Sequence, residues 1–426
     1  MNTIKPGRHL IGVAAALLLG GAAQVRAQDR SHLMDGLNDP SKHAIEVKSQ
    51  GYFFAGGRYF TAADGAGPFM VDQMYVEYQI PKEVKHPYPV VLIHGGGLTG
   101  TYMMGTPDNR PGWSTFFLAN GYAVYVVDQT GRGKSAYHAD IYGPTTRGNA
   151  TGLQQRFTAV QLYNLWPQAH LHTQWPGSGL MGDLSFDQFY ASEVPGMASA
   201  VTQQSTMRAA GAALLDRIGP AIILTHSQSG PYGWLIADAR PTLVKGLLQV
   251  EPSGPPFYDV MQLGAPTWFA DGNLSRPWGI AAIPLTYSPA VSDPAQLAFV
   301  EEATADKPDV VRCRLQTAPA HQLPTLQGIP IVIIASQASY HASYDHCTSK
   351  YLTQAGVENT FVRLESVGIT GNGHMMMLEK NNLDIAAFMA QWLRENVERR
   401  AKGEKGEKGK GEKGKGEKGK KGKKGD

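Results

Sequence analysis

Five continuous apolar runs constrain the fold of this chain more than any other feature of its sequence. The runs cover residues 90–93, 123–127, 221–224, 247–250 and 331–334. A strand with one face in water alternates apolar and polar residues, whereas a strand covered on both faces is apolar throughout. Stretches with helical spacing separate the runs. We therefore expect an α/β fold, with a mostly parallel sheet flanked by helices.

The same periodicities predict further elements. Residues 70–80 alternate between apolar and polar side chains, which is typical of a half-buried strand. Helical spacing predicts a helix over residues 207–218 and a last helix from Ile385 to Trp392, with Asn382 as its N-cap. We expect the last helix to cover the sheet.

Two long stretches, residues 139–200 and 254–326, interrupt this alternation, and neither has the pattern of a sheet. Insertions of this length within a compact domain usually serve a function, such as a lid over a site. We therefore expect one domain over residues 28–400, in which the two insertions form a cap.

The first 27 residues have the pattern of a secretory signal peptide. Lys5 and Arg8 precede an apolar run over residues 10–23, and Val25-Arg26-Ala27 resembles a cleavage site. The alternative is an uncleaved membrane anchor, but an apolar run of about 14 residues is shorter than the roughly 20 that span a bilayer. We expect cleavage after Ala27, a secreted or periplasmic protein, and no stable membrane insertion afterwards.

The overall charge of +3 hides an acidic body between two basic ends. Residues 28–400 carry 25 basic and 31 acidic side chains, a net charge of −6, so this body has no general attraction for nucleic acid. The last 26 residues carry 11 Lys and five acids in Gly-Glu-Lys and Gly-Lys units. We expect residues 401–426 to form a disordered tail, either a solubilising extension or a weak anchor to anionic surfaces.

The chain has only two cysteines, Cys313 and Cys347. In an oxidising compartment two cysteines without competitors can form one disulfide. Two free, buried thiols are the alternative.

A candidate nucleophile lies where the apolar run 221–224 ends. The sequence Thr225-His226-Ser227-Gln228-Ser229-Gly230 follows, and then a stretch with helical spacing. A serine on such a strand–turn–helix projects its hydroxyl above the sheet edge, with a helix N-terminus beneath it. We expect Ser227 to be this serine. Ser229 is a competing nucleophile, although it lies one step into the helix.

A serine hydroxyl needs a base to take its proton and an acid to orient that base. His374 is the best candidate for the base, because it lies on a loop between a predicted strand at residues 360–364 and the last helix. Two candidates for the acid lie between Ser227 and His374 in the chain, each after one of the apolar runs. Glu251 follows the run 247–250 directly, whereas Asp345 lies on the loop after the run 331–334. We prefer Glu251 and keep Asp345 as the alternative.

A glycine-rich turn, His94-Gly95-Gly96-Gly97, follows the first apolar run. Such a turn can present backbone N–H groups to a developing oxyanion. We expect one donor from Gly96 or Gly97 and the other from Gln228.

Two other motifs carry little weight. The turn at residues 128–135 ends in Gly-Lys-Ser but lacks the first glycine of a phosphate-binding loop. His170 and His172 have no evident third ligand, so no metal is expected.

These motifs together resemble the α/β-hydrolase superfamily. They look most like its secreted bacterial carboxylesterases, in which the acid of the triad is a Glu. The resemblance spans about residues 50–398 and includes the opening segment 51–57. It implies an eight-stranded, mostly parallel sheet, no cofactor, and ester hydrolysis through an acyl-enzyme. The implied nucleophile, acid and base are Ser227, Glu251 and His374.

The resulting hypothesis is a secreted serine hydrolase that cleaves a small-molecule ester, with a homodimer as a conceivable assembly. Lactones or small amides remain alternative substrates for the same triad, and a non-catalytic binding protein remains an alternative function. Four aromatic side chains of the insertions are expected either to line the substrate pocket or to form the insertions' own core: Trp166, Trp175, Phe257 and Trp268.

Overall fold

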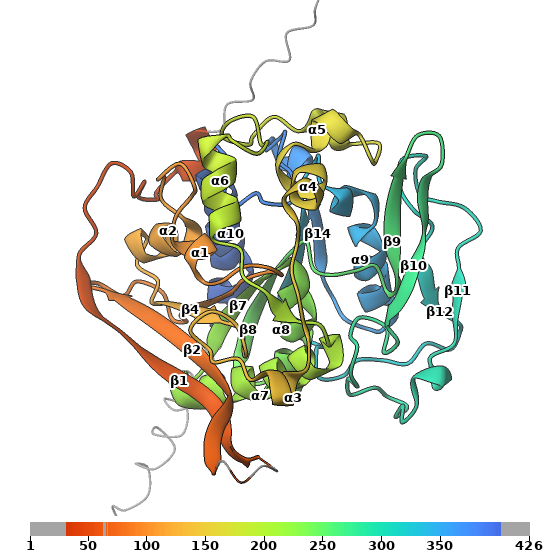
Figure 1. The fold of residues 1–426 in the computed structure, drawn as a ribbon, viewed down its shortest axis with the longest axis horizontal. Helices are drawn as coiled ribbons and strands as arrows, with labels where there is room; N and C mark the ends of the chain where they lie inside the picture. Colours follow the sequence, from red (N-terminus) through yellow and green to blue (C-terminus); the bar gives the residue numbers. More distant parts are fainter. Residues whose placement is uncertain (1–30, 63–64, 66, 402–426) are drawn as a thin grey trace, which may run out of the picture.

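The computed structural model describes residues 31–62, 65 and 67–401. The expected signal peptide and the tail beyond Ala401 lie outside these residues. The main sheet has eight strands in the order β1-β2-β4-β3-β7-β8-β13-β14 (Figure 1). Their bounds are β1 Val47–Thr61, β2 Pro68–Pro81, β3 Val90–Ile93, β4 Val124–Asp128, β7 Ala221–His226, β8 Val244–Val250, β13 Ile331–Ala335 and β14 Thr360–Arg363.

The expected mostly parallel sheet is confirmed. Strand β2 pairs antiparallel with β1 and with β4, whereas every pairing from β4 to β14 is parallel. Each of the five apolar runs lies in one of the parallel strands, and the alternating segment at residues 70–80 lies in β2.

The apolar runs are continuous because both faces of the sheet are covered. In β3, Val90 and Leu92 face one core, while Val91 and Ile93 face the other. Helices α2 (Trp113–Ala119) and α10 (Asn382–Leu393) pack on the first face. The second face is covered by α7 (Ala200–Ile218), α8 (Gly230–Ala239) and α9 (Asp345–Gln354).

The helix boundaries differ from the sequence predictions in two places. Helix α7 begins at Ala200 rather than at residue 207, and the Ser199 side chain caps it by accepting a hydrogen bond from the N–H of Thr202. The predicted N-cap of α10 is wrong, since Asn381 is the cap and Asn382 is the first helical residue. The Asn382 side chain instead donates to the carbonyl of Pro111 at 2.9 Å.

The two insertions lie beside the main sheet rather than in it. The prediction that neither contains sheet is wrong, because short strands pair with one another there: β5 with β6, β9 with β10, and β11 with β12. These pairs are hard to recognise because many of their side chains are exposed or half-buried and no third strand covers them. The helices α4, α5 and α6 lie at the top of Figure 1, and β9–β12 lie at its right.

The remaining elements are short, apart from the strands of the second insertion. The helices are α1 Thr101–Met104, α3 Ala139–Tyr142, α4 Ala150–Leu153, α5 Val160–Tyr163 and α6 Leu184–Ala191. The strands are β5 Thr145–Thr146, β6 Gly196–Met197, β9 Phe257–Gly264, β10 Trp268–Arg276, β11 Phe299–Glu301 and β12 Arg314–Gln316. The single turns are η1 Ser31–Met34, η2 Gln154–Thr158, η3 Ala169–Leu171, η4 Ser227–Ser229, η5 Pro294–Gln296, η6 Tyr340–Ser343, η7 Leu364–Val367 and η8 Arg394–Glu398.

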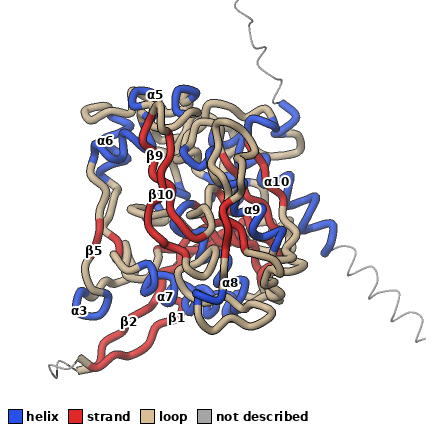
Figure 2. The backbone as a smooth tube through the Cα atoms, turned by 90° about the vertical axis from the view of Figure 1, so that its right-hand side faces the viewer, coloured by secondary structure: helices blue, strands red, loops and turns tan. Residues whose placement is uncertain are grey.

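The β1–β2 hairpin projects from the body as an arm (Figure 2). Among the helices in the described ranges, none is both long and apolar enough to cross a bilayer.

Cys313 and Cys347 form a disulfide, so the alternative of two free thiols is wrong. Cys313 precedes β12 in the second insertion, and Cys347 lies in α9. Both cysteines are buried. The bond therefore ties the second insertion to a helix that packs on the main sheet.

Replacing both cysteines by serine is expected to lower the thermal unfolding midpoint by several degrees. The bond spans 34 residues, and the loop entropy of a closed loop of this length is worth about 3–4 kcal/mol. Differential scanning fluorimetry of the wild type, with and without reductant, and of the double variant measures this effect. Equal midpoints for the oxidised wild type and the double variant would contradict this prediction.

Candidate active site

The candidate residues gather at one edge of the main sheet. Strands β3, β7, β8, β13 and β14 are parallel neighbours, so their carboxyl ends lie at the same edge. Ligands of open α/β sheets bind at this edge. The loops that follow these strands carry the glycine turn, Ser227, Glu251, Tyr340 and His374.

Ser227 occupies a strained turn between β7 and α8. Its φ is +56°, in the left-handed region that non-glycine residues rarely adopt. Close packing leaves no room for larger neighbours, since a Cβ on Gly230 would lie 2.4 Å from Pro252 Cβ. The N–H of Ser253 donates to the Ser227 carbonyl at 2.9 Å. These contacts hold the turn that directs Ser227 away from the sheet.

Ser229 is a support of this turn. It is fully buried, and its hydroxyl donates to the Ile93 carbonyl at 2.8 Å while accepting from the N–H of His226 at 2.8 Å. Thr225 is buried too and donates to the Gln249 side chain at 2.6 Å. The polar side chains of Thr225 and Ser229, on either side of Ser227, are therefore satisfied. Ser227, by contrast, is partly exposed.

Glu251 contacts His374 directly, with 2.6 Å between Glu251 Oε2 and His374 Nδ1. Both side chains are buried. Burial raises the pKa of the Glu251 carboxyl, and donors from two serines oppose that shift. The N–H and hydroxyl of Ser336 donate at 2.7 and 2.6 Å, and the hydroxyl of Ser339 donates at 2.7 Å.

Asp345, the alternative acid, pairs with a different histidine. Its Oδ1 lies 2.8 Å from Nδ1 of His341, and both side chains are buried. The His341 ring lies parallel to the His374 ring, at 4.8 Å between centroids. The structure thus brings Glu251, and not Asp345, into hydrogen-bond contact with His374.

The loop that carries His374 is fixed by the buried carboxylate of Glu379. This carboxylate accepts from the N–H of Gly373 at 2.9 Å and from the Asn372 side chain at 2.8 Å. Its Oε1 also lies 2.7 Å from His172 Nε2, in the first insertion. One carboxylate therefore connects the first insertion to the residue that precedes His374.

Tyr340 connects Ser227 and His374. Its hydroxyl lies 3.3 Å from His374 Nε2. Burial raises the pKa of Tyr340 to about 12, while Arg156 and a hydrogen bond with Ser227 oppose the shift. Among the described residues, this hydroxyl rather than a direct Ser227–His374 hydrogen bond joins the two side chains. Catalytic hydrogen bonds are often long in a protein without substrate and tighten in the complex.

The first insertion covers His374 through the π-helical turn η2. Phe157, in this turn, stacks on the His374 ring at 5.2 Å between centroids. Its neighbour Arg156 lies over the Tyr340 ring, 4.5 Å from the centroid. Turns of this kind are frequent at functional sites.

The glycine turn after β3 lies beside Ser227. A Cβ on Gly95 would lie 3.1 Å from Ser227 Cβ, and one on Gly96 would lie 3.5 Å from the Gln228 side chain. Within the described residues, the N–H groups of Gly96, Gly97 and Gln228 donate no hydrogen bond. These groups are therefore free to serve an oxyanion.

Arg132 holds this arrangement together from the turn at residues 128–135. Its buried guanidinium donates through Nη1 to the Gly95 carbonyl and to Gln228 Oε1, both at 3.1 Å. The turn itself is closed by Asp128, whose carboxylate accepts from the N–H groups of Gly100 and Lys134 at 2.7 and 2.8 Å. This turn has a structural role beside the site.

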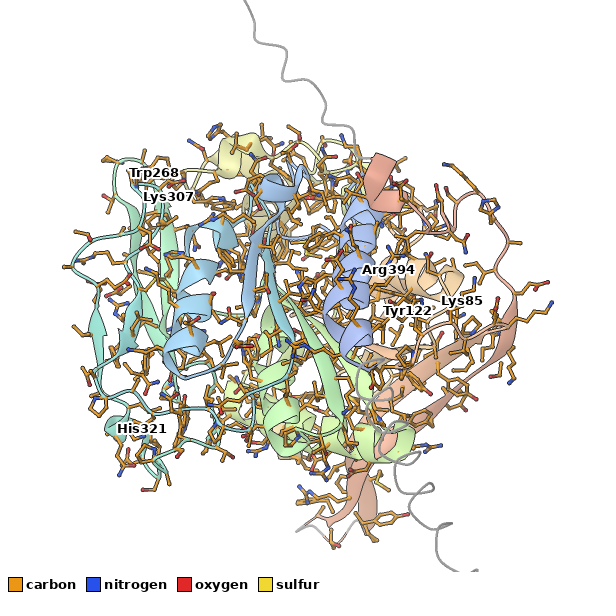
Figure 3. All side chains as sticks on the ribbon, turned by 180° about the vertical axis from the view of Figure 1, so that it is seen from behind. Lys85, Tyr122, Trp268, Lys307, His321 and Arg394 are labelled. Atoms are coloured by element: carbon orange, nitrogen blue, oxygen red, sulfur yellow. A yellow bond between two sulfur atoms is a disulfide. The ribbon has the colours of Figure 1, made fainter. Side chains whose placement is uncertain are left out.

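The four aromatic residues expected near the pocket do not gather in one place. Trp166 is buried close to the site, with its ring 5.8 Å from that of Tyr340. Trp175 and Phe257 are buried in two different cores, so they pack within the protein rather than line a shared pocket. Figure 3 places Trp268 at the outer end of the β9–β10 hairpin.

Several residues that complete the arrangement were not predicted: Arg132, Phe157, Ser336, Ser339, Tyr340 and His341. The signal for three of them was positional, because Ser336, Ser339 and Tyr340 follow β13 at the same sheet edge. His341 follows Tyr340 on the same loop, whereas contacts across the fold, which periodicity does not reveal, place Arg132 and Phe157.

Within the part of the chain that the structure describes, two groups of side chains have the composition of a metal site. The first contains Cys313 and Cys347, whose sulfurs are bonded to each other, together with His346. The second is Glu251, His341 and His374, already described. His172 pairs with Glu379, whereas His170 is exposed.

Comparisons with known proteins show the family to which this fold belongs. Residues 90–388 match the model of the Alpha/beta hydrolase family. The chain belongs to the alpha/beta hydrolase family. It is 44% identical over 346 residues to the "Probable secreted lipase phiG" of Fungal sp. (strain ATCC 74256), covering 81% of this chain and 89% of the relative. It also matches the solved structure of "a Novel Bacterial Esterase", at 24% identity and a TM-score of 0.53, covering 83% of this chain and 98% of that one.

The matched region of this hydrolase contains all the loops described above. It begins at the first residue of β3 and ends inside α10. The solved structure confirms the α/β-hydrolase fold expected from the resemblance.

Four buried histidines are expected to make this hydrolase less stable as the pH falls. Burial lowers the pKa of His94 to about 3 and that of His341 to about 4, and it holds the pKa values of His226 and His374 well below the usual range. Unfolding exposes these groups to protons, so between about pH 4 and 6.5 the four histidines bind more protons in the unfolded state. Burial raises the pKa of Glu193 to about 8 and raises those of Glu251 and Asp345, which opposes this trend at fewer sites. The thermal midpoint should therefore be lower at pH 5 than at pH 7.

The exposed His170 supplies a control. A His170→Gln variant should show the same pH dependence as the wild type by differential scanning fluorimetry. An equal or higher midpoint at pH 5 would contradict the prediction.

Proposed function

We propose that this protein is a secreted serine hydrolase that cleaves carboxylic esters through an acyl-enzyme, with Ser227, His374 and Glu251 as its triad. The 2.6 Å contact of Glu251 with His374, next to the strained turn of Ser227, is the observation that carries this proposal. The fungal relative is named a lipase and the bacterial structure is named an esterase, and these names support an ester as the substrate class. Secretion rests on the signal-like residues 1–27 and on the word "secreted" in the relative's name.

In the proposed mechanism, His374 Nε2 takes the proton of Ser227 Oγ as that oxygen attacks the ester carbonyl. Glu251 holds the imidazole by its Nδ1 and stabilises the imidazolium. The N–H groups of Gln228 and of Gly96 or Gly97 bind the oxyanion, and each such donor is typically worth about 10²- to 10³-fold in rate. His374 then gives the proton to the departing alcohol. Water repeats the sequence on the acyl-enzyme and releases the acid.

Tyr340 is a partner of both reacting side chains in this proposal. Because burial raises the pKa of its hydroxyl to about 12, the hydroxyl stays protonated at neutral pH. Before substrate binds, the Tyr340 hydroxyl forms one hydrogen bond with Ser227 and one with His374, and so fixes the positions of both side chains. Substrate binding then brings Ser227 onto His374.

A fluorophosphonate probe tests the nucleophile. Folded wild-type protein should gain one adduct, located by mass spectrometry on the peptide that contains Ser227. Ser227→Ala protein and heat-denatured wild type should gain none, because attack needs both the hydroxyl and its base. An adduct on another serine, or no adduct on folded wild type, would remove the proposed nucleophile.

Replacing each acid by its amide tests the third member of the triad. Glu251→Gln should lower kcat by roughly 10³- to 10⁴-fold, because the imidazole loses the group that sets its tautomer. Asp345→Asn should lower kcat less than about tenfold, since that carboxyl contacts His341 instead.

Both variants carry an isosteric change at a buried position, so their thermal midpoints serve as the folding control. A larger loss of kcat from Asp345→Asn than from Glu251→Gln, in folded protein, would make Asp345 rather than Glu251 the acid of the triad.

A further inference from the structure

A cavity of about 560 Å³ adjoins the candidate active site. Trp166, Tyr340 and Tyr344 supply aromatic walls, and Ser253 also lines the cavity. The N–H of Ser253 donates to the Ser227 carbonyl, and the Tyr340 hydroxyl lies against His374. The cavity therefore shares its walls with the site, and its volume falls in the range of small-molecule pockets.

Three charged side chains line this cavity: Arg156, Asp259 and Arg276. Arg276 is buried and compensated, with its Nη2 2.8 Å from Asp259 and its Nε donating to the Pro255 carbonyl at 2.6 Å. His341, which also lines the cavity, is neutral near pH 7 because burial lowers its pKa to about 4. The lining therefore carries one net positive charge.

That charge is Arg156. Its guanidinium lies over the Tyr340 ring and, within the described part of the chain, makes no ion pair with a carboxylate. Arg156 comes from the first insertion, while Arg276 and Asp259 come from the second. The two insertions thus meet around a positive centre, next to the proposed nucleophile and base.

The position of Arg156 also opposes the proposed chemistry. After burial and His341, its charge is a further cause that lowers the pKa of His374. A positive charge near the imidazole disfavours the imidazolium that forms when Ser227 loses its proton. An anion bound to Arg156 would cancel this effect.

We propose that the cavity binds a carboxylate of the substrate, so that the ester cleaved at Ser227 carries a free acid group paired with Arg156. The inference rests on the proposed function and narrows its substrate class. A guanidinium can bind a carboxylate through two parallel N–H···O bonds, and the aromatic walls would cover the carbon chain between the acid and the ester.

Matched ester pairs test this proposal. Methyl half-esters of succinate, glutarate and adipate carry the acid on the acyl side, and the corresponding methyl ester amides are their neutral counterparts. O-acetylglycolate and O-acetylglycolamide form a further pair, in which the acid or the neutral amide lies on the alcohol side of the ester. The ratio of kcat/KM, anionic over neutral, is measured for each pair at low and high salt.

In the wild type, at least one pair should favour the anionic ester by about 3- to 10-fold, since Arg156 is exposed and water screens its pairing with a carboxylate. Arg156→Gln should bring that ratio to about one, and Arg156→Lys should keep part of it. Arg147→Gln, an exposed arginine of the same insertion outside the cavity lining, is the matched control and should keep the wild-type ratio.

The outcomes separate the two proposals. A ratio near one in the wild type, or a ratio that Arg156→Gln leaves unchanged in folded protein, overturns the carboxylate site while ester hydrolysis stands. Failure to hydrolyse either member of any pair, together with no fluorophosphonate adduct at Ser227, overturns the proposed function itself.

Discussion

The buried carboxylate of Glu251 is the constraint on which the rest of the site depends. A carboxylate removed from water is strongly destabilising unless donors surround it. Here the donors are Ser336, Ser339 and His374, which come from the loops after β13 and β14. Satisfying one charge at the end of β8 therefore fixes two neighbouring loops. The sheet brings the loops close together, and the hydrogen bonds to the charged Glu251 side chain fix the positions of the loops relative to each other.

Backbone strain is concentrated at the same edge. Ser227 and Glu251 both have positive φ values, +56° and +43°, and each costs of order 1–3 kcal/mol. The surrounding packing supports this strain, as the close approach of Gly230 to Pro252 shows. The loop that begins with Glu251 also supplies Ser253, whose N–H holds the Ser227 carbonyl. The two strained turns therefore stabilise each other, and the nucleophile is held in position before a substrate arrives.

Only those features that leave a local signal in the sequence could be predicted from it. The central strands could be predicted because burial on both faces leaves a continuous apolar run, and the Ser227 turn because it joins such a run to a helix. The hairpin β9–β10 could not, since its partly exposed strands pair only with each other. Position after a strand favoured Glu251 over Asp345, and the structure places Glu251 on His374. Tyr340 had a positional signal, because it follows β13 at the same sheet edge, whereas Arg156 could not be predicted because it reaches the site from an insertion.

The residues of the candidate site come from two parts of the fold, the main sheet and the first insertion. The proposed triad lies on loops of the main sheet, whereas Phe157 and Arg156, which cover it, belong to an insertion. Glu379 couples the two, because one carboxylate binds both Gly373 and His172. A movement of the first insertion would therefore act on the base through this carboxylate as well as through the stacked Phe157 ring. In the proposed mechanism, the first insertion and the base His374 are thus linked through the buried contact between His172 and Glu379.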